Sequence, residues 1–194
     1  MKPLEPPDSF HLQAAQGWCE LHSFLEANEE LEKIAPGLRA HPSVMEVRWQ
    51  ICANLEKWGA ALDIASAIVT MAPDWASGWI YRASSLTELN RQEEAYETLS
   101  TAAARFPSAE IILYDLACAC CSLKRFDEAR EWLRKAIEEG GNEIKLRALD
   151  DPDLEPLWKD IGSTLPAAIH SASVIDASSC GAGTRHGSAA RLRL

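Results

Sequence analysis

The sequence lacks any segment that would anchor it in a bilayer or direct it to secretion. No run of 18 or more apolar residues occurs in the 194-residue chain, so no membrane-spanning helix is expected. Residues 1–8 contain three prolines and two acids, without the apolar stretch after a basic start that marks a secretory signal. These absences predict a cytoplasmic protein without membrane insertion.

The sequence also has little that could support catalysis or a cofactor. Its five histidines are dispersed, and no Ser-His-Asp or paired-carboxylate arrangement follows from helical spacing. No glycine-rich loop follows a strand pattern, so a phosphate cradle is not expected. The six cysteines are unlike the disulfide framework of a small secreted chain. We therefore predict no enzyme, no cofactor and no metal site.

Positive charge is scarce relative to negative charge. The formal net charge is −10, and the three arginines after Asp176 make the body before them more acidic still. Such a body repels nucleic-acid backbones and anionic lipid, and it favours neutral or basic partners. The sequence therefore predicts no nucleic-acid binding, although the charge could also serve solubility alone.

What the chain does contain is a repeat of 34 residues. Leucine recurs at this interval, and so does alanine six residues later: Leu21, Leu55, Leu89 and Leu123; Ala27, Ala61, Ala95 and Ala129. A fixed period of 34 is typical of a helix-turn-helix unit stacked on copies of itself. The period predicts an all-α, right-handed solenoid with four units: 8–41, 42–75, 76–109 and 110–143.

Each unit is expected to consist of a helix A, a tight turn and a helix B. We number positions within a unit from its first residue. Small residues dominate positions 8 and 20, where helices A and B must approach closely. We expect the leucines at position 14 and bulky groups at position 24 to fill the layer between units. Pro or Gly at position 32 of three units would end helix B.

At this level the chain resembles the tetratricopeptide repeat family. Six residues of the third unit fall where the family signature places Trp, Gly or Ala, Ala, Phe, Ala and Pro: Trp79, Ala83, Ala95, Leu99, Ala102 and Pro107. In the fourth unit, residues 126–129 resemble the family's Tyr-Glu-Glu-Ala turn. The resemblance covers about three quarters of the chain and implies a protein-binding module in a family with many different partners.

Two positions depart from the pattern, and both ends differ from the repeats. Trp49 stands at position 8, where a small residue is usual, and Ala65 is the candidate to make room for it. Arg39 replaces Pro in the first unit.

Residues 1–7 form an N-terminal extension, and 144–170 are expected to cap the fourth unit through Leu146, Leu149, Leu154, Leu157 and Trp158. The composition of residues 171–194 predicts a disordered tail.

The resemblance implies that the A helices line a concave groove that binds a peptide. The groove positions include ten residues that we take as the candidate site: Leu12, Glu46, Val47, Gln50, Ile80, Tyr81, Ser84, Tyr114, Asp115 and Cys118. No Lys or Arg occupies the groove positions, which disfavours the carboxylate clamp known in this family. The groove should instead suit a protein or peptide segment that is apolar with basic residues.

Tyr81 and Tyr114 are the expected anchors of that segment, because aromatic residues dominate peptide contacts. The alternative is that both tyrosines only fill space between neighbouring A helices.

Two other functions stay open: a dedicated secretion or assembly chaperone, and a redox or soft-metal protein using Cys118 and Cys121, which share one helix face. Cys120 is expected in the core, and self-association through the convex face or an exposed end is possible.

Overall fold

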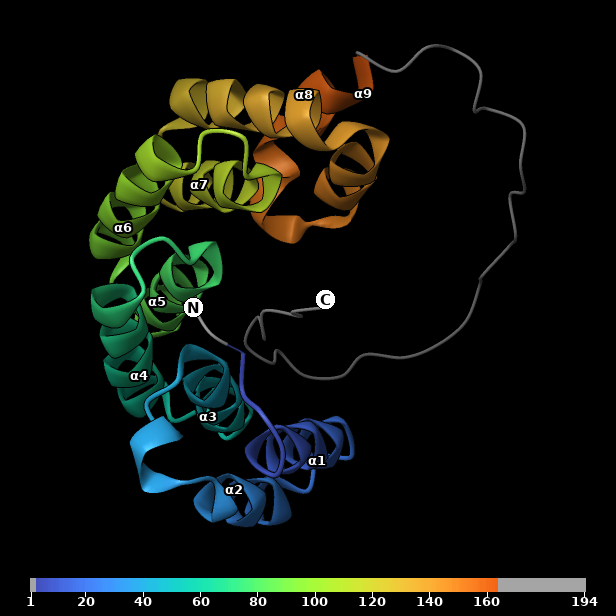
Figure 1. The fold of residues 1–194 in the computed structure, drawn as a ribbon. Coiled ribbons are helices and arrows are strands. Elements are labelled where there is room, and N and C mark those ends of the chain that lie inside the picture. Colours follow the sequence, from blue (N-terminus) through green and yellow to red (C-terminus); the bar gives the residue numbers. More distant parts are fainter. Residues whose placement is uncertain (1–2, 164–194) are drawn as a thin grey trace, which may run out of the picture.

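The structure of the protein is a computed structural model, and it describes residues 3–163. Every regular element in this part of the chain is a helix, and the helices form an arc of two layers (Figure 1). The inner layer holds the A helices: α1 (Asp8–Glu20), α3 (Pro42–Asn54), α5 (Ala76–Glu88) and α7 (Glu110–Ser122). The outer layer holds the B helices: α2 (Phe24–Lys33), α4 (Trp58–Met71), α6 (Gln92–Arg105) and α8 (Phe126–Asp150). The predicted all-α solenoid is confirmed.

The turn from each A helix to its B helix has the same backbone in every unit. Position 15 lies in the left-handed region, with φ between 55° and 60°, at His22, Glu56, Asn90 and Lys124. Its N–H donates to the carbonyl of position 12, and the next N–H donates to the carbonyl of position 11, as in Lys124–Cys121 and Arg125–Cys120. This pair of bonds is the Schellman motif, which satisfies carbonyls at a helix end.

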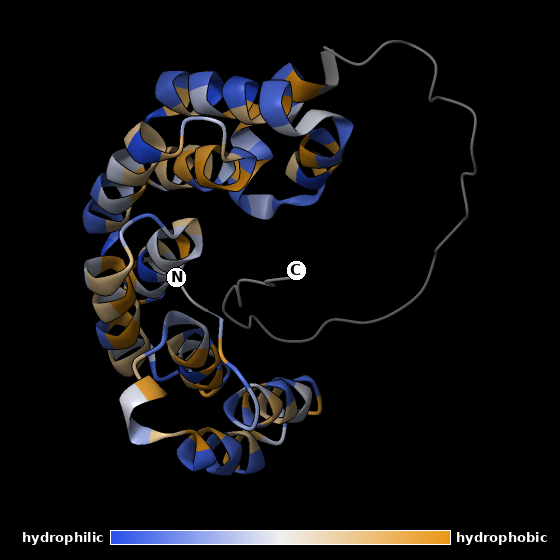
Figure 2. Ribbon diagram, in the orientation of Figure 1, coloured by the Kyte–Doolittle hydropathy of each residue, from blue (hydrophilic) through white to orange (hydrophobic). Residues whose placement is uncertain are grey.

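Packing between the layers follows the predicted pattern of small residues. The alanines at positions 8 and 20 are all buried: Ala15, Ala83 and Ala117; Ala27, Ala61, Ala95 and Ala129. Hydrophilic residues lie along the outer faces of α6 and α8 (Figure 2). Two of the leucines at position 14 were wrongly predicted as packing residues, since Leu21 is 69% exposed and Leu55 is 43% exposed, whereas Leu89 and Leu123 are half-buried. Position 14 is the C-cap of each A helix, so its side chain lies at the edge of the layer.

Trp49 is accommodated in the core instead of a small residue. It is buried in a cluster with Ala61, Ala65, Ile68 and Tyr81. Its ring stacks on Tyr81, with the ring centroids 4.3 Å apart and an interplanar angle of 18°. The two alanines of α4 leave the volume that the indole fills, in agreement with the predicted exchange of large for small.

Arg39 ends the first unit by a different means from proline. Its Nε donates to the carbonyl of Ile34 at 2.9 Å, and its guanidinium also bonds the carbonyl and the carboxylate of Glu32. A cation at this end of α2 satisfies carbonyls that the helix leaves open and complements the helix dipole.

The C-terminal cap begins inside α8. Gly141, with φ 64° and ψ −146°, breaks the helix, and the part after it packs with η2 (Pro152–Leu157) and α9 (Trp158–Ser163). Residues of this segment complete the core: Ile144, Ala148, Leu154, Leu157 and Ile161. Leu146 was wrongly predicted to join them, because it is 61% exposed. The rest of the predicted cap and the predicted tail lie outside the described residues.

Candidate functional site

The inner face of the arc is formed by the A helices (Figure 1). Of the ten candidate residues, seven keep part of their surface accessible: Leu12, Glu46, Gln50, Ile80, Ser84, Asp115 and Cys118. The other three, Val47, Tyr81 and Tyr114, are buried. The structure therefore divides the candidate site into an accessible set and a set that belongs to the core.

Tyr81 is not available as a surface anchor in this conformation. Only 4% of it is exposed, because its ring lies against Trp49 and its hydroxyl donates to the Glu46 carboxylate. Burial and this carboxylate raise the pKa of the Tyr81 hydroxyl far above its ordinary value. Tyr81 thus links α5 to α3, which is the space-filling role that the sequence left open.

Tyr114 is covered by the C-terminal cap. It is 1% exposed, its hydroxyl donates to Asp151 Oδ2 at 2.6 Å, and the Arg147 guanidinium lies 4.6 Å from its ring centroid. Burial, followed by the bond to Asp151, raises the pKa of the Tyr114 hydroxyl. Nothing in the spacing of the repeat indicates that residues beyond the fourth unit fold back onto this side chain.

Carboxylates on the two faces of the arc have different partners. Outer-layer acids form ion pairs with arginines, as Glu93 does with Arg125 at 2.7 Å and Glu94 with Arg91 at 2.6 Å. On the inner face, Glu46 and Asp151 instead accept hydrogen bonds from tyrosine hydroxyls. Within residues 3–163 neither of them is paired with a cation. Arg147, whose guanidinium lies over the Tyr114 ring, offsets part of this negative charge, and the Glu46 and Asp151 carboxylates are otherwise held by hydrogen bonds.

Asp115 lies within this group of inner-face acids. Burial is the largest of the effects that bring the pKa of its carboxyl to about 7; Arg147 opposes the rise and Asp151 adds to it. A carboxyl with this pKa is about half ionised at neutral pH, so a cation brought beside it would favour the ionised form. Asp115 can thus respond to a basic group from a partner.

The cysteine cluster has the environment of packing residues. Cys120 is fully buried, as predicted. Burial raises the pKa of Cys120 to about 12 and that of Cys121 to about 11. Burial and the nearby carboxylates also raise the pKa of the Cys118 thiol. Raised pKa values favour the protonated thiol, which is a weak nucleophile and a poor metal ligand. In the described part of the chain, no group of three or more His, Cys, Asp or Glu could hold a metal ion.

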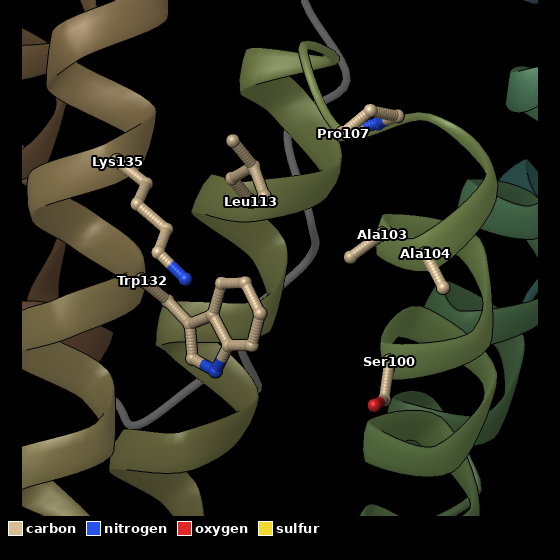
Figure 3. A pocket seen from close by; sticks show the side chains of 7 residues that line it. All are labelled: Ser100, Ala103, Ala104, Pro107, Leu113, Trp132 and Lys135. Atoms are coloured by element: carbon tan, nitrogen blue, oxygen red, sulfur yellow. The ribbon is translucent and has the colours of Figure 1, made fainter.

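A hollow of about 470 Å³ lies between α6, α7 and α8 (Figure 3). The side chains that line it are Ser100, Ala103, Ala104, Pro107, Leu113, Trp132 and Lys135. Lys135 Nζ lies 4.1 Å from the centroid of the Trp132 ring, so this ammonium group is held against an aromatic face. The lining includes no carboxylate, imidazole or thiol, and sequence reasoning did not identify it.

None of the helices in residues 3–163 is both long and apolar enough to cross a bilayer. This agrees with the absence of long apolar runs in the sequence.

Comparison with known proteins relates the chain to one repeat family. Residues 86–149 match the family model for the tetratricopeptide repeat. MamA from Desulfovibrio magneticus RS-1 is similar in structure, with a TM-score of 0.62 at 14% identity, over 83% of this chain and 94% of that chain. A thermophilic tetratricopeptide-repeat protein of Thermus thermophilus, TTC0263, has a TM-score of 0.62 at 18% identity, over 80% of this chain and 83% of that chain. No curated protein matches the sequence. At these identities the structural similarity concerns the fold.

Proposed function

We propose that this chain, which carries tetratricopeptide repeats, is a non-catalytic protein-interaction module that binds a partner's extended segment on its inner face. The fold supports the general role, because stacked helix pairs present long surfaces suited to protein partners. The accessible inner-face residues define the expected contact surface: Leu12, Glu46, Gln50, Ile80, Ser84, Asp115 and Cys118.

The chemistry of the segment follows from the charges on this face. One observation carries the proposal. On the inner face, the carboxylates of Glu46 and Asp151 are bound by tyrosine hydroxyls, whereas on the outer layer acids such as Glu93 and Glu94 form ion pairs with arginines. A segment with lysine or arginine would supply the missing cations, and apolar side chains could contact the half-buried Leu12 and Ile80. Because both tyrosines are buried, polar and ionic contacts take the place of the aromatic anchors first expected.

A binding assay with defined peptides tests this proposal. The probes are a fluorescein-labelled peptide alternating lysine and leucine, and its counterpart with glutamate in place of lysine. We expect fluorescence anisotropy to show binding of the lysine peptide only, weakened by added salt because the contact is ionic. Glu46→Gln and Asp115→Asn should each weaken it about tenfold, the effect expected for an ionic contact of this kind.

Glu97→Gln is the matched control, because it makes the same change of charge at an exposed position on α6. It should leave the affinity unchanged. Equal binding of the two peptides, or equal loss in the control and in Glu46→Gln, would contradict an inner-face site. Binding should also strengthen from pH 6 to pH 8, since a bound cation favours ionised Asp115, whose pKa is about 7.

A further inference from the structure

One side of α1 carries an apolar stripe that is open to solvent. Phe10, Ala14, Gly17 and Leu21 are spaced four, three and four residues apart, which places them on one face of the helix. Phe10 is 63% exposed and Leu21 is 69% exposed. A Cβ atom added to Gly17 would meet nothing within 4 Å. We call these four residues the α1 stripe.

Two of these four positions are covered in the other three units. Positions 3 and 10, which Phe10 and Gly17 occupy in the first unit, are buried there: Val44, Gly78 and Ile112; Ile51, Ser85 and Ala119. Gly78 shows what covers them, because a Cβ at Gly78 would lie 2.6 Å from Ile68 Cγ2 on α4, the B helix of the preceding unit. No helix precedes α1 in the described residues. Phe10 and Gly17 therefore lie where this protein elsewhere packs the preceding helix, whereas position 14, which Leu21 occupies, is also exposed at Leu55.

The order of side chains along the stripe is large, small, small, large. Reversing the helix places Phe10 opposite Leu21 and Ala14 opposite Gly17. A surface that matches its own reverse is what a two-fold symmetric contact requires. The small residues at the centre allow two helices to approach closely, while Phe10 of each copy covers Leu21 of the other.

From this pattern we infer that the α1 stripe binds a second copy of the chain, with the two α1 helices antiparallel about a two-fold axis between Ala14 and Gly17. The charged groups of α1 are compatible with this contact. His11 bonds Glu30 at 2.9 Å and Asp8 accepts from the Ala35 N–H at 2.7 Å, so both are engaged with neighbouring segments rather than with the stripe.

Glu20, the remaining acid of α1, flanks the stripe near one end. In the antiparallel arrangement the two Glu20 side chains lie at opposite ends of the contact, roughly 13 Å apart along the helix axis. Like charges therefore do not meet at its centre. The net charge of −10 on each copy still causes long-range repulsion, which salt screens. Self-association should strengthen as the ionic strength rises.

The area available indicates a weak and reversible dimer. A whole aromatic side chain offers about 150–250 Å², so the exposed parts of the stripe amount to roughly 300 Å² per copy. For the two copies together this is roughly 600 Å², below the roughly 1,000 Å² of a stable specific interface, so only a weak and transient dimer is expected. Two copies joined at this end would present two inner faces in one particle, which could raise the affinity for a repeated segment.

Sedimentation velocity on the full chain tests the inference. Between about 1 and 200 µM we expect a shift from monomer to dimer by mass action. Phe10→Glu should weaken dimerisation at least about tenfold by placing a charge in the contact. Gly17→Leu should also weaken it, because it separates the helices, although it adds apolar surface. Leu146→Glu is the matched control, since Leu146 is equally exposed at the far end of the arc.

Circular dichroism should show the wild-type helix content for each variant. Thermal unfolding of Phe10→Glu and Leu146→Glu should match the wild type, because these side chains are exposed, whereas Gly17→Leu should unfold at a higher temperature, since leucine favours a helix more than glycine does. The inference is overturned by a monomer at every concentration. It is overturned equally if Leu146→Glu weakens the dimer as much as Phe10→Glu does, or if Gly17→Leu leaves the dimer unchanged.

Discussion

The contact between Trp49 and Ser85 should account for a measurable share of the stability of the arc. Trp49 is 1% exposed and Ser85 is fully buried. The indole Nε1 donates to Ser85 Oγ at 2.9 Å, and this hydroxyl in turn donates to the Tyr81 carbonyl at 2.8 Å. The hydrogen bond joins α3 to α5 and therefore links the second unit to the third.

The cost of breaking this bond depends on which partner is removed. Ser85→Ala leaves a buried indole N–H without an acceptor, and we expect a loss of about 2 kcal/mol in the free energy of unfolding. Trp49→Phe keeps a ring beside Tyr81 but loses the hydrogen bond and part of the buried apolar area, at about 2–3 kcal/mol. The double variant should lose only about 3 kcal/mol, because no donor is left unpaired.

The coupling between the two changes is thus expected at about 1–2 kcal/mol. Urea unfolding followed by far-ultraviolet circular dichroism measures it without depending on tryptophan fluorescence. Ser84→Ala, which alters the adjacent half-exposed serine, is the control and should stay within about 0.5 kcal/mol of the wild type. A coupling energy near zero would refute the reasoning, because it would mean that the hydrogen bond does not contribute.

Three further predictions concern the backbone and one carboxyl. Glu56→Gly should raise the free energy of unfolding by about 0.5–1 kcal/mol, because Glu56 has a left-handed conformation with φ 55° that glycine adopts without strain. An unchanged free energy in urea unfolding would contradict this prediction. Gly78→Ala should lower the free energy of unfolding by about 1–3 kcal/mol, because the added Cβ would clash with Ile68. Gly59→Ala should raise it by up to about 1 kcal/mol, because the space around its Cβ is open and alanine favours a helix. Similar effects of the two variants would argue against the close approach of α4 and α5 at Gly78. The pKa of the Asp115 carboxyl is about 7 in the folded protein, against an ordinary value of 3.8. Between these two pH values the folded state binds more protons than the unfolded state, so the stability of the fold falls as the pH rises from 3.8 to 7. Asp115→Asn should reduce the loss between pH 5 and pH 8 and be the more stable protein at pH 8, and an unchanged loss would exclude Asp115 as its source.

The sequence predicted most of the fold because the fold is local and repeated. The A helices begin at Asp8, Pro42, Ala76 and Glu110, at intervals of 34 residues. Small residues at two repeat positions predicted where helices approach closely, and the burial of Cys120 followed from its register. Each of these features depends on helical periodicity and on contacts within one unit or with its neighbour, which a 34-residue pattern records directly.

The candidate site was less predictable, as Tyr81 and Tyr114 show. Register placed both on the inner face, but Tyr81 is covered through stacking with Trp49, an exception to the repeat, and Tyr114 is covered by Arg147 and Asp151 from the cap. The left-handed turn residue was also missed, since none of the four is glycine. In each case the deciding contact involves a residue that departs from the repeat or lies outside it.

The sequence by itself determined the period, the helices and the side of each helix that faces its neighbours, because these depend on the spacing of small and apolar residues. Only the tertiary structure decided which inner-face side chains remain accessible and which acids lack a cation. It also showed that Phe10 and Gly17 on α1 are left uncovered while the same two repeat positions are buried in the later units. The physical reason is that the exposure of a side chain depends on which segment packs against it. At both ends of a repeat array the neighbouring segment is not another repeat, so the repeat pattern does not predict what covers the side chains there.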